Sequence, residues 1–312
     1  MDRKPQLLIT GASGFTGIHA CTHFSNLNYE VTAVSRGHVN QQPQSIRTEC
    51  CELSNKDEVN LLIQKVKPDY LLHLAGQNHV DRSWNDPIAT IESNLLSTLY
   101  VVEAIRTLNL TCKIVIAGSA LQFDPSNLST LHHPYSLSKT LQVLIAQAWE
   151  KLYKMDIVIA KTTNLIGPGP SNGVCSIFAS KIVKMENGKS ESYLDVSNVN
   201  TTRDFLDVRD AVRAYEILFQ RGRSGEIYQI CSGKYRSLEV ILDKLKSLSA
   251  IDLKVNSQSN HMDQTLHAIQ PKSLAKLGWS QKYDIEQSLI DTLNYYRYNE
   301  KKIEKENGYS DV

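Results

Sequence analysis

The sequence has no marked excess of charge of either sign. Its 34 lysines and arginines nearly balance 33 aspartates and glutamates, which leaves a formal net charge of +1 at pH 7. No run of basic residues is long enough to form the stripe with which a protein neutralises nucleic-acid phosphates. The composition therefore argues against nucleic acid and against an anionic membrane surface as partners.

Long hydrophobic runs are also lacking. No apolar run approaches the roughly 18 residues of a membrane span, and only a short apolar segment follows Asp2, Arg3 and Lys4, so no signal peptide is expected. The six cysteines show neither CxxC spacing nor neighbouring histidines. We therefore expect no metal site, and reduced, mostly buried thiols in a cytoplasmic protein.

What the sequence does contain is a strand, a tight turn and a helix close to its start. An apolar strand runs into Gly11, Gly14 and Gly17, and apolar residues at helical spacing follow. Such a turn needs glycines, because they allow positive φ and let the backbone approach a diphosphate without a Cβ. The N–H groups and dipole at the helix start would then bind an anion. An ordinary glycine-rich turn is the alternative, since this motif alone is not specific.

Strands and helices alternate after this turn. Strands are predicted at residues 30–34, 48–51, 70–76, 113–117 and 156–161, and helices at residues 57–66, 87–106 and from Pro134 onward. The alternation predicts an α/β fold with a doubly wound parallel sheet. The second half is expected to mix short strands and helices, with helices at residues 175–185 and 207–220 and further segments at residues 193–205, 237–249 and after residue 251.

The chain is expected to divide into two domains. Residues 1–165 would form an NADP(H)-binding domain, with a return segment near residues 201–230. Residues 166–312 would form mainly a smaller α/β cap that binds the substrate. The last dozen residues, 301–312, are charged, and we expect them to be loosely ordered.

The end of the second strand bears on the choice of cofactor. In a dinucleotide-binding fold an acidic residue there would bind the adenosine ribose of NAD, whereas a cation accommodates the 2′-phosphate of NADP. Ser35 and Arg36 offer a hydroxyl and a guanidinium, and no carboxylate follows nearby. This favours NADP(H) over NAD(H), and a solvated loop arginine is the alternative.

Three further polar residues have two interpretations each. Glu52 could meet the adenine edge or be an exposed carboxylate with no such role. His79 follows the carboxyl end of a strand, where ligands bind in such sheets, and could face the substrate or be structural. Asn94 lies in an apolar helix, so its amide needs partners, which water or backbone near a catalytic lysine could supply.

Tyr135 and Lys139 are spaced to lie one turn apart on a helix that Pro134 would open. A lysine ammonium near a phenol, reinforced by a cationic nicotinamide, favours the phenolate and lowers the pKa of Tyr135 below about 10. The tyrosine then becomes an acid or base near neutral pH. Ser119, at the end of the preceding strand, can hold the same substrate oxygen. A Tyr-Lys pair alone arises by chance on many helices, whereas its combination with the glycine turn and Ser119 does so rarely.

Over nearly its whole length the sequence resembles the extended short-chain dehydrogenase/reductases that modify nucleotide sugars. The segments that carry the resemblance are residues 11–17 (GASGFTG), 73–77 (HLAGQ), Ser119, 135–139 (YSLSK), Asn164 with 167–169 (GPG), and 202–208 (TRDFLDV). Residues 77–84 and 225–233 are most similar to the branch of GDP-mannose 4,6-dehydratases and GDP-4-keto-6-deoxymannose reductases.

The resemblance implies a Rossmann sheet and a set of site residues. Ser119, Tyr135 and Lys139 would be catalytic, with Lys139 also holding the nicotinamide ribose, and His79, Ser119, Asn164 and Arg203 would bind the substrate, the last two near its diphosphate. The cofactor would be bound by Gly11, Ser13, Gly14, Phe15, Thr16, Gly17, Ser35, Arg36, Glu52, Leu53, Leu74, Ala75, Gly76, Asn94, Tyr135 and Lys139. A homodimer is also implied, formed as a four-helix bundle by the helices at residues 87–106 and 135–153.

Departures from the family pattern bear on the reaction. Family dehydratases follow their catalytic serine or threonine with an Asp-Glu pair, which supplies an acid for the leaving hydroxyl and a base for the C5 proton. Ala120 and Leu121 stand there and cannot move a proton. Family 4-epimerases usually carry an acidic residue where this chain has Ser35 and Arg36.

These departures favour an NADPH-dependent reductase of a 4-keto-6-deoxyhexose linked to GDP, UDP or dTDP, which would supply a 6-deoxysugar for surface polysaccharide. The alternatives are a 4-epimerase with bound NAD, a 4,6-dehydratase and a non-catalytic NADP(H)-binding sensor. Three further departures concern the substrate site. The loop between Ser119 and Tyr135 is short, Lys161 stands where an arginine is common, and the family's late diphosphate arginine is replaced near residues 260–263.

Overall fold

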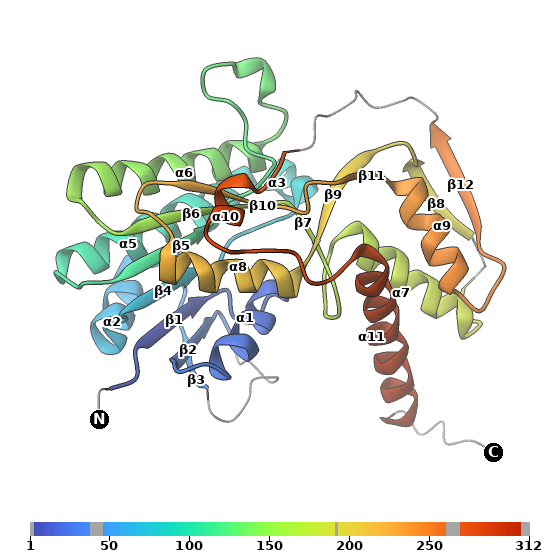
Figure 1. The fold of residues 1–312 in the computed structure, drawn as a ribbon, viewed down its shortest axis with the longest axis horizontal. Helices are drawn as coiled ribbons and strands as arrows, with labels where there is room; N and C mark the ends of the chain where they lie inside the picture. The colour runs from blue at the N-terminus through green and yellow to red at the C-terminus, as the bar shows by residue number, and fades with distance from the viewer. Residues whose placement is uncertain (1–2, 38–45, 191–192, 260–268, 307–312) are drawn as a thin grey trace. The chain divides into compact units, whose positions relative to one another are not determined.

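A parallel sheet is the central element of the part of the chain that precedes residue 231 (Figure 1). The computed structural model describes residues 3–37, 46–190, 193–259 and 269–306. Within them, seven strands pair in the order β10-β6-β5-β4-β1-β2-β3, and every pairing is parallel. The strands are β1 (Gln6–Thr10), β2 (Glu30–Ser35), β3 (Arg47–Cys50), β4 (Tyr70–His73), β5 (Lys113–Ala117), β6 (Ile157–Thr162) and β10 (Ile227–Ile230). The expected doubly wound parallel sheet is confirmed.

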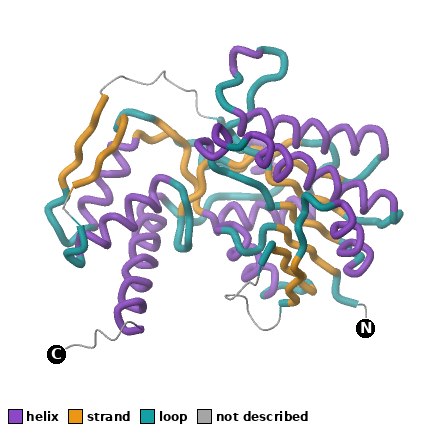
Figure 2. The backbone as a smooth tube through the Cα atoms, turned by 180° about the vertical axis from the view of Figure 1, so that it is seen from behind, coloured by secondary structure: helices purple, strands orange, loops and turns teal. Residues whose placement is uncertain are grey.

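Helices cover this sheet, which is why its central strands are mainly apolar and buried, whereas the edge strand β3 is polar and largely exposed. The helices α2 (Lys56–Val66), α5 (Ser97–Thr107) and α6 (Pro134–Tyr153) join the strands in one buried core through residues such as Ile63, Ile105 and Val143. The helix α1 (Phe15–Ser25) packs against α8 (Val208–Arg221), with the ring centroids of Phe24 and Phe219 5.8 Å apart. Figure 2 shows the strands of the sheet lying between these helices.

The chain forms two compact units. Unit 1 comprises residues 1–162, 212–230 and 272–279, and contains the seven-stranded sheet. Unit 2 comprises residues 163–211, 231–271 and 280–312. The chain therefore returns to unit 1 twice after residue 162, first with α8 and β10 and then with the short helix α10 (Lys272–Lys276).

Unit 2 contains two small sheets and its own core. The strands β11 (Tyr235–Ser237), β9 (Thr202–Asp207) and β7 (Asn164–Ile166) form one sheet, and β12 (Lys254–Ser259) pairs with β8 (Tyr193–Asn198). The helices α7 (Val174–Glu186), α9 (Leu238–Leu248) and α11 (Ile285–Glu306) enclose a core that includes Phe178, Ile182, Leu242 and Leu289.

The expectation that residues 301–312 are loosely ordered is wrong for residues 301–306, which continue helix α11. The helix is held by its buried residues Leu289 and Leu293 and by the ion pair of Arg297 with Glu186, at 2.6 Å. Once the helix is anchored in this way, its charged last turns need no apolar contact to continue it. Residues 307–312 lie outside the described part of the chain.

The helix expected over residues 87–106 consists of three segments. These are α4 (Pro87–Ile91), the π-helical turn η1 (Glu92–Leu96) and α5. The stretch Pro87–Thr107 also has the length and apolar composition of a membrane span, which the sequence analysis did not expect. Its apolar character has a simpler cause here, because Val101, Val102 and Ile105 are buried in the core of unit 1.

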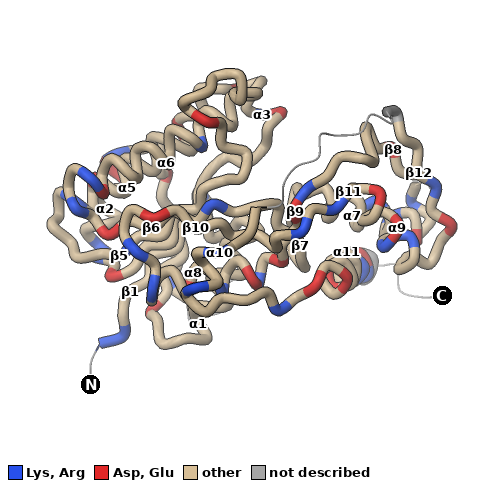
Figure 3. The backbone as a smooth tube through the Cα atoms, turned by 45° about the horizontal axis from the view of Figure 1, so that its top comes forward, with Lys and Arg blue, Asp and Glu red and all other residues tan. Residues whose placement is uncertain are grey.

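Two shorter helical elements remain, and neither charged nor thiol side chains gather in one part of the described chain. The remaining helical segments are α3 (Val80–Asn85) and the 3-10 turn η2 (Leu128–Thr130), and residues 193–205 fall in the separate strands β8 and β9. Acidic and basic residues are interspersed along the chain of both units (Figure 3). Five of the six cysteines are buried, Cys50 is exposed, and all six are free.

Candidate active site

The glycine turn between β1 and α1 is packed so tightly that it requires glycine. Gly11 has a φ of +69°, and a Cβ added to it would lie 2.7 Å from the backbone nitrogen of Ala75. A Cβ on Gly17 would lie 2.1 Å from the carbonyl oxygen of Gly11. Helix α1 begins at Phe15 with no acidic residue in its first turn, so its N–H groups can bind an anion.

The other proposed cofactor residues lie at the same edge of the sheet, because the carboxyl ends of parallel strands coincide there. Ser13 and Gly14 are exposed in the turn, and Phe15 and Thr16 are half-buried. Leu74, Ala75 and Gly76 follow β4, and the backbone N–H of Ala75 donates to Thr10 Oγ1 at 3.3 Å.

The strands β2 and β3 place four further residues at this edge. Ser35 is buried and donates to the carbonyl oxygen of Gly37, whereas Arg36 is exposed. Leu53 is buried. The exposed carboxylate of Glu52 accepts a hydrogen bond of 2.9 Å from Ser54 Oγ, so it is engaged in its own turn.

Ser119, Tyr135 and Lys139 are brought together where β5 ends and α6 begins. Ser119 follows β5 by two residues, and Pro134 occupies the first turn of α6, which confirms the predicted helix start. The hydroxyl of Ser119 is a hydrogen-bond partner of the Tyr135 phenol and also accepts from the N–H of Leu121 at 3.1 Å. All three residues are buried.

The electrostatics of this group differ from the expectation. Burial raises the pKa of Tyr135, and its hydrogen bond with Ser119 acts in the opposite direction. Burial lowers the pKa of Lys139 to about 7. The lowered Tyr135 pKa that was expected beside Lys139 and a cationic nicotinamide is not found in this structure, because burial outweighs the hydrogen bond with Ser119. The Lys139 ammonium donates to the carbonyl oxygen of Ala117, at 2.7 Å, and to Gln142.

Asn94 and His79 have different surroundings. Asn94 is fully buried in the π-helical turn, where its Oδ1 accepts from the N–H of Gln77 at 2.7 Å. Its Nδ2 donates to the carbonyl oxygen of Gln77 at 3.0 Å and to Ser138 Oγ at 2.8 Å. The backbone partner expected for this amide is present, and Ser138 adjoins Lys139. His79 is exposed just before α3, on the loop that follows β4.

The substrate residues predicted in unit 2 lie on neighbouring strands. Asn164, on β7, donates through Nδ2 to the carbonyl oxygen of Asp204 at 3.0 Å. Arg203, on β9, lies directly opposite Arg236 of β11 in an antiparallel pair. Both arginines are half-buried, and within the described residues neither forms an ion pair. Sequence reasoning missed Arg236, because its pairing with Arg203 depends on the contact of β11 with β9, and only its residue type could be seen in the sequence.

A second group that sequence reasoning missed is a buried polar chain around Lys139. It consists of Thr10, His73, Thr98 and Gln142, each at most 1% exposed. The available signal was the occurrence of polar side chains at positions of strands and helices that are otherwise apolar. Across the described residues, no cluster of three or more histidine, cysteine or acidic side chains is placed to hold a metal ion.

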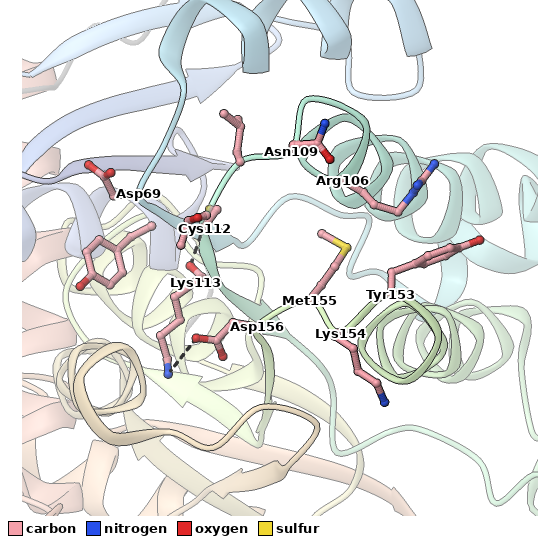
Figure 4. Close-up of a pocket in the computed structure, with 12 residues that line it drawn as sticks. Asp69, Arg106, Asn109, Cys112, Lys113, Tyr153, Lys154, Met155 and Asp156 are labelled. Carbon is pink, nitrogen blue, oxygen red and sulfur yellow. Dashed lines mark hydrogen bonds and ion pairs between the residues drawn. The ribbon is translucent and has the colours of Figure 1, made fainter.

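The pocket drawn in Figure 4 belongs to the opposite edge of the sheet. Its lining includes Asp69, Cys112 and Asp156, which immediately precede β4, β5 and β6. Lys113 and Asp156 form an ion pair there, with Nζ and Oδ2 3.4 Å apart. Because Ser119, Tyr135 and Lys139 lie at the carboxyl ends of these strands, the pocket is no part of the candidate active site.

The chain is similar to one protein family and to several individual proteins. The model of the NAD dependent epimerase/dehydratase family matches residues 7–231. GDP-6-deoxy-D-mannose reductase of Pseudomonas aeruginosa is 26% identical, over 91% of this chain and 94% of its own. A putative UDP-glucose 4-epimerase of Methanocaldococcus jannaschii is 24% identical, over 94% of this chain and 99% of its own.

Among solved structures, that of RMD from Pseudomonas aeruginosa complexed with NADPH has a TM-score of 0.81 and 24% identity. The match covers 95% of this chain and 98% of that one. At this level of identity the likeness shows the fold. It extends over both units of the chain.

Proposed function

Because the chain belongs to the NAD dependent epimerase/dehydratase family, we propose that it reduces the C4 keto group of a nucleotide-linked 4-keto-6-deoxyhexose with NADPH. One observation carries this choice of reaction. Ser119 and Tyr135 are hydrogen-bonded beside Lys139, while the two positions after Ser119 hold side chains that cannot exchange a proton. Ala120 is fixed there by its N–H, which donates to the carbonyl oxygen of Thr162 at 2.9 Å.

The glycine turn fits a dinucleotide, because Gly11 and Gly17 leave the space that a Cβ would fill and α1 offers free N–H groups. The pyrophosphate would bind at this turn, and Ser35, Arg36 and Leu53 would surround the adenosine. Within the described residues no carboxylate pairs with Arg36, so its guanidinium is available to a 2′-phosphate. When bound, the reduced nicotinamide supplies a hydride to the sugar C4.

The protein residues would supply the proton and hold the oxygen. The Ser119 hydroxyl donates to the keto oxygen, and Tyr135 transfers its phenolic proton to that oxygen as the alcohol forms. The ammonium of Lys139 stabilises the phenolate left behind, which solvent reprotonates. The raised pKa of Tyr135 suits this direction, since the phenol holds its proton until the oxygen becomes basic.

Unit 2 would bind the diphosphate of the substrate. Arg203 and Arg236 occupy the same face of a β-ribbon, and like charges directly opposite are unfavourable unless an anion neutralises them. A diphosphate has the charge and the acceptor oxygens for two guanidinium groups. His79 and Asn164 remain proposed substrate contacts, and residues 260–263 lie outside the described part of the chain.

We also propose a cytoplasmic homodimer that works toward a surface polysaccharide. Large apolar side chains are exposed on the helices expected to form the four-helix bundle, with Ile88 at 71% on α4, and Leu144 at 43% and Leu152 at 68% on α6. A second copy of the chain would cover them.

A 4-epimerase is the second candidate, favoured by the similarity to a putative enzyme of that class. The two are separated by following the absorbance of reduced nicotinamide with 4-keto-6-deoxy sugars on GDP, UDP and dTDP in parallel, and NADH as the control cofactor. The reductase consumes NADPH with one of these substrates, and Tyr135→Phe abolishes the consumption. No consumption with any of them, together with NAD bound to the purified protein, would replace the reductase with the epimerase.

A further inference from the structure

The ammonium group of Lys139 is held by two acceptors. It donates to the carbonyl oxygen of Ala117 at 2.7 Å and to Oε1 of Gln142. Gln142 lies on the next turn of α6, is 0% exposed, and donates from Nε2 to Thr98 Oγ1 at 2.8 Å. A buried glutamine with both ends engaged has little freedom to rotate.

The orientation of the Gln142 amide follows from the charge that it faces. An ammonium only donates hydrogen bonds, so the oxygen of the amide must face Lys139 and its NH2 group must face Thr98. The single hydroxyl hydrogen of Thr98 is donated to the carbonyl oxygen of Asn94, at 2.8 Å. Thr98 Oγ1 is therefore an acceptor toward its other neighbours.

His73 is fixed in one tautomer by this arrangement. Its Nε2 lies 2.9 Å from Thr98 Oγ1 and must carry the hydrogen, so its Nδ1 accepts from Thr10 Oγ1 at 2.8 Å. Burial and the charge of Lys139 lower the pKa of His73 to about 3, which keeps the imidazole neutral. Thr10 in turn accepts from the N–H of Ala75, at 3.3 Å, and immediately precedes the glycine turn.

We propose that Gln142 is a positioning residue for Lys139, held in place by the chain Thr98, His73 and Thr10 behind it. The inference rests on the proposed function, in which Lys139 is the lysine that supports Tyr135. Two of the three ammonium N–H groups are taken by Ala117 and Gln142, which leaves one for the ribose of the cofactor or the phenol. Gln142 thus fixes the direction in which the Lys139 ammonium points, and it stabilises the protonated form of this lysine.

Among the described residues, few titratable groups lie near enough to the Lys139 ammonium to change its pKa as Gln142 would. The titratable side chains near the ammonium are Tyr135, one turn earlier on α6, and His73 on β4. The helix α5 contributes Thr98, which does not titrate, and β5 contributes a backbone carbonyl. Within the described residues Lys139 has no carboxylate partner, so the amide oxygen of Gln142 is its main side-chain acceptor.

The titration of Lys139 can be measured directly on the full-length chain before any cofactor is added. Lysine labelled with carbon-13 at Cε gives one NMR signal per residue, and the signal missing in Lys139→Met identifies this one. In Gln142→Met the acceptor is lost while the volume is kept, and we expect the titration midpoint to fall by about one pH unit. In Gln142→Glu a carboxylate replaces the amide, and we expect a rise of about one unit.

Gln147→Met is the matched control, since Gln147 lies on the same helix and is not a hydrogen-bond partner of Lys139. This variant should leave the midpoint unchanged. Circular dichroism melting checks that each variant is folded. The proposal is overturned if folded Gln142→Met and Gln142→Glu keep the wild-type midpoint, or if both shift it in the same direction.

The titration needs neither substrate nor cofactor, so its outcome is separate from the test of the reductase. If the midpoint shifts in opposite directions in Gln142→Met and Gln142→Glu but no NADPH is oxidised, the positioning role of Gln142 is retained and the proposed reductase reaction is rejected. Activity with no shift would reject the positioning role alone. In an active enzyme, Gln142→Met should also lower kcat, move the pH profile in the direction of the NMR shift, and leave KM for the nucleotide sugar unchanged.

Discussion

The Lys139 ammonium donates a hydrogen bond of 2.7 Å to the carbonyl oxygen of Ala117, the last residue of β5. The lysine is only 7% exposed, and in the described part of the chain no carboxylate balances its charge. Burial disfavours the charged form of such a cation, so the pKa of Lys139 is lowered from its usual 10.5 to about 7. The residue proposed to support catalysis therefore destabilises the fold.

Replacing Lys139 by methionine should stabilise the protein at pH 7 while abolishing reduction. Between pH 7 and 10.5 the unfolded chain keeps a proton on this lysine that the folded chain has lost, so the lysine makes wild-type stability increase with pH. The increase from one such group approaches 1.4 kcal/mol per pH unit. Urea unfolding of wild type and Lys139→Met at pH 7.0 to 8.5 measures this effect. The quantity to follow is the difference between their free energies of unfolding at each pH.

We expect this difference to favour Lys139→Met by about 1 to 4 kcal/mol at pH 7 and to shrink as the pH rises. The lower part of this range allows for the acceptors Ala117 and Gln142, which lose their donor in the variant. A difference that is independent of pH would mean that the lysine is charged in the folded protein across the whole range.

The parts of the site that the sequence predicted depend on local patterns. The glycine turn is a run of neighbouring residues, and the strands around it are recognisable because parallel strands buried on both faces are continuously apolar. Tyr135 and Lys139 meet because Pro134 opens a helix, and helical spacing then fixes their separation.

The parts that the sequence did not predict depend on distant contacts. The hydrogen bond of Thr10 with His73 spans 63 positions, and that of Gln142 with Thr98 spans 44. The π-helical turn at Glu92–Leu96, in which Asn94 bonds to Gln77, is not recognisable from a periodicity of 3.6 residues. The raised pKa of Tyr135 depends on its burial, which helical spacing does not reveal.

Gly17→Ala should damage both stability and cofactor binding. The added Cβ would lie 2.1 Å from the carbonyl oxygen of Gly11 and 2.7 Å from Cα of Ala12, and backbone atoms cannot move aside as a flexible side chain can. We expect a loss of about 1 to 3 kcal/mol in the free energy of unfolding. Gly37→Ala is the control, since a Cβ on Gly37 meets nothing within 4 Å. Equal melting temperatures for the two variants would contradict this packing of the turn.

Arg36→Met should weaken the binding of NADPH and leave that of NADH almost unchanged. The exposed guanidinium would meet the 2′-phosphate, which only NADPH carries, and a charge-assisted contact of this kind accounts for a factor of about 10 to 100 in affinity. Titration followed by nicotinamide fluorescence gives both dissociation constants without any substrate. Arg47→Met serves as the control, because Arg47 is paired with Glu30 at 2.5 Å. A parallel loss of affinity for both cofactors would show that Arg36 contacts a part that they share.

Arg236→Met distinguishes a substrate-binding role of Arg236 from a structural role, because the two roles predict different changes in stability and in KM for the nucleotide sugar. Arg236 lies directly opposite Arg203 in the antiparallel pair of β9 and β11, so removing one charge relieves a repulsion and should stabilise the unliganded protein by a few tenths of a kcal/mol. The same change removes one of the two cations proposed to hold the diphosphate, and KM for the nucleotide sugar should rise about tenfold with KM for NADPH unchanged. A purely structural arginine would lower stability when replaced and would affect both substrates. Thermal melting together with steady-state kinetics decides between the two roles, because a diphosphate site built from opposed like charges gives higher stability and weaker substrate binding in the same variant.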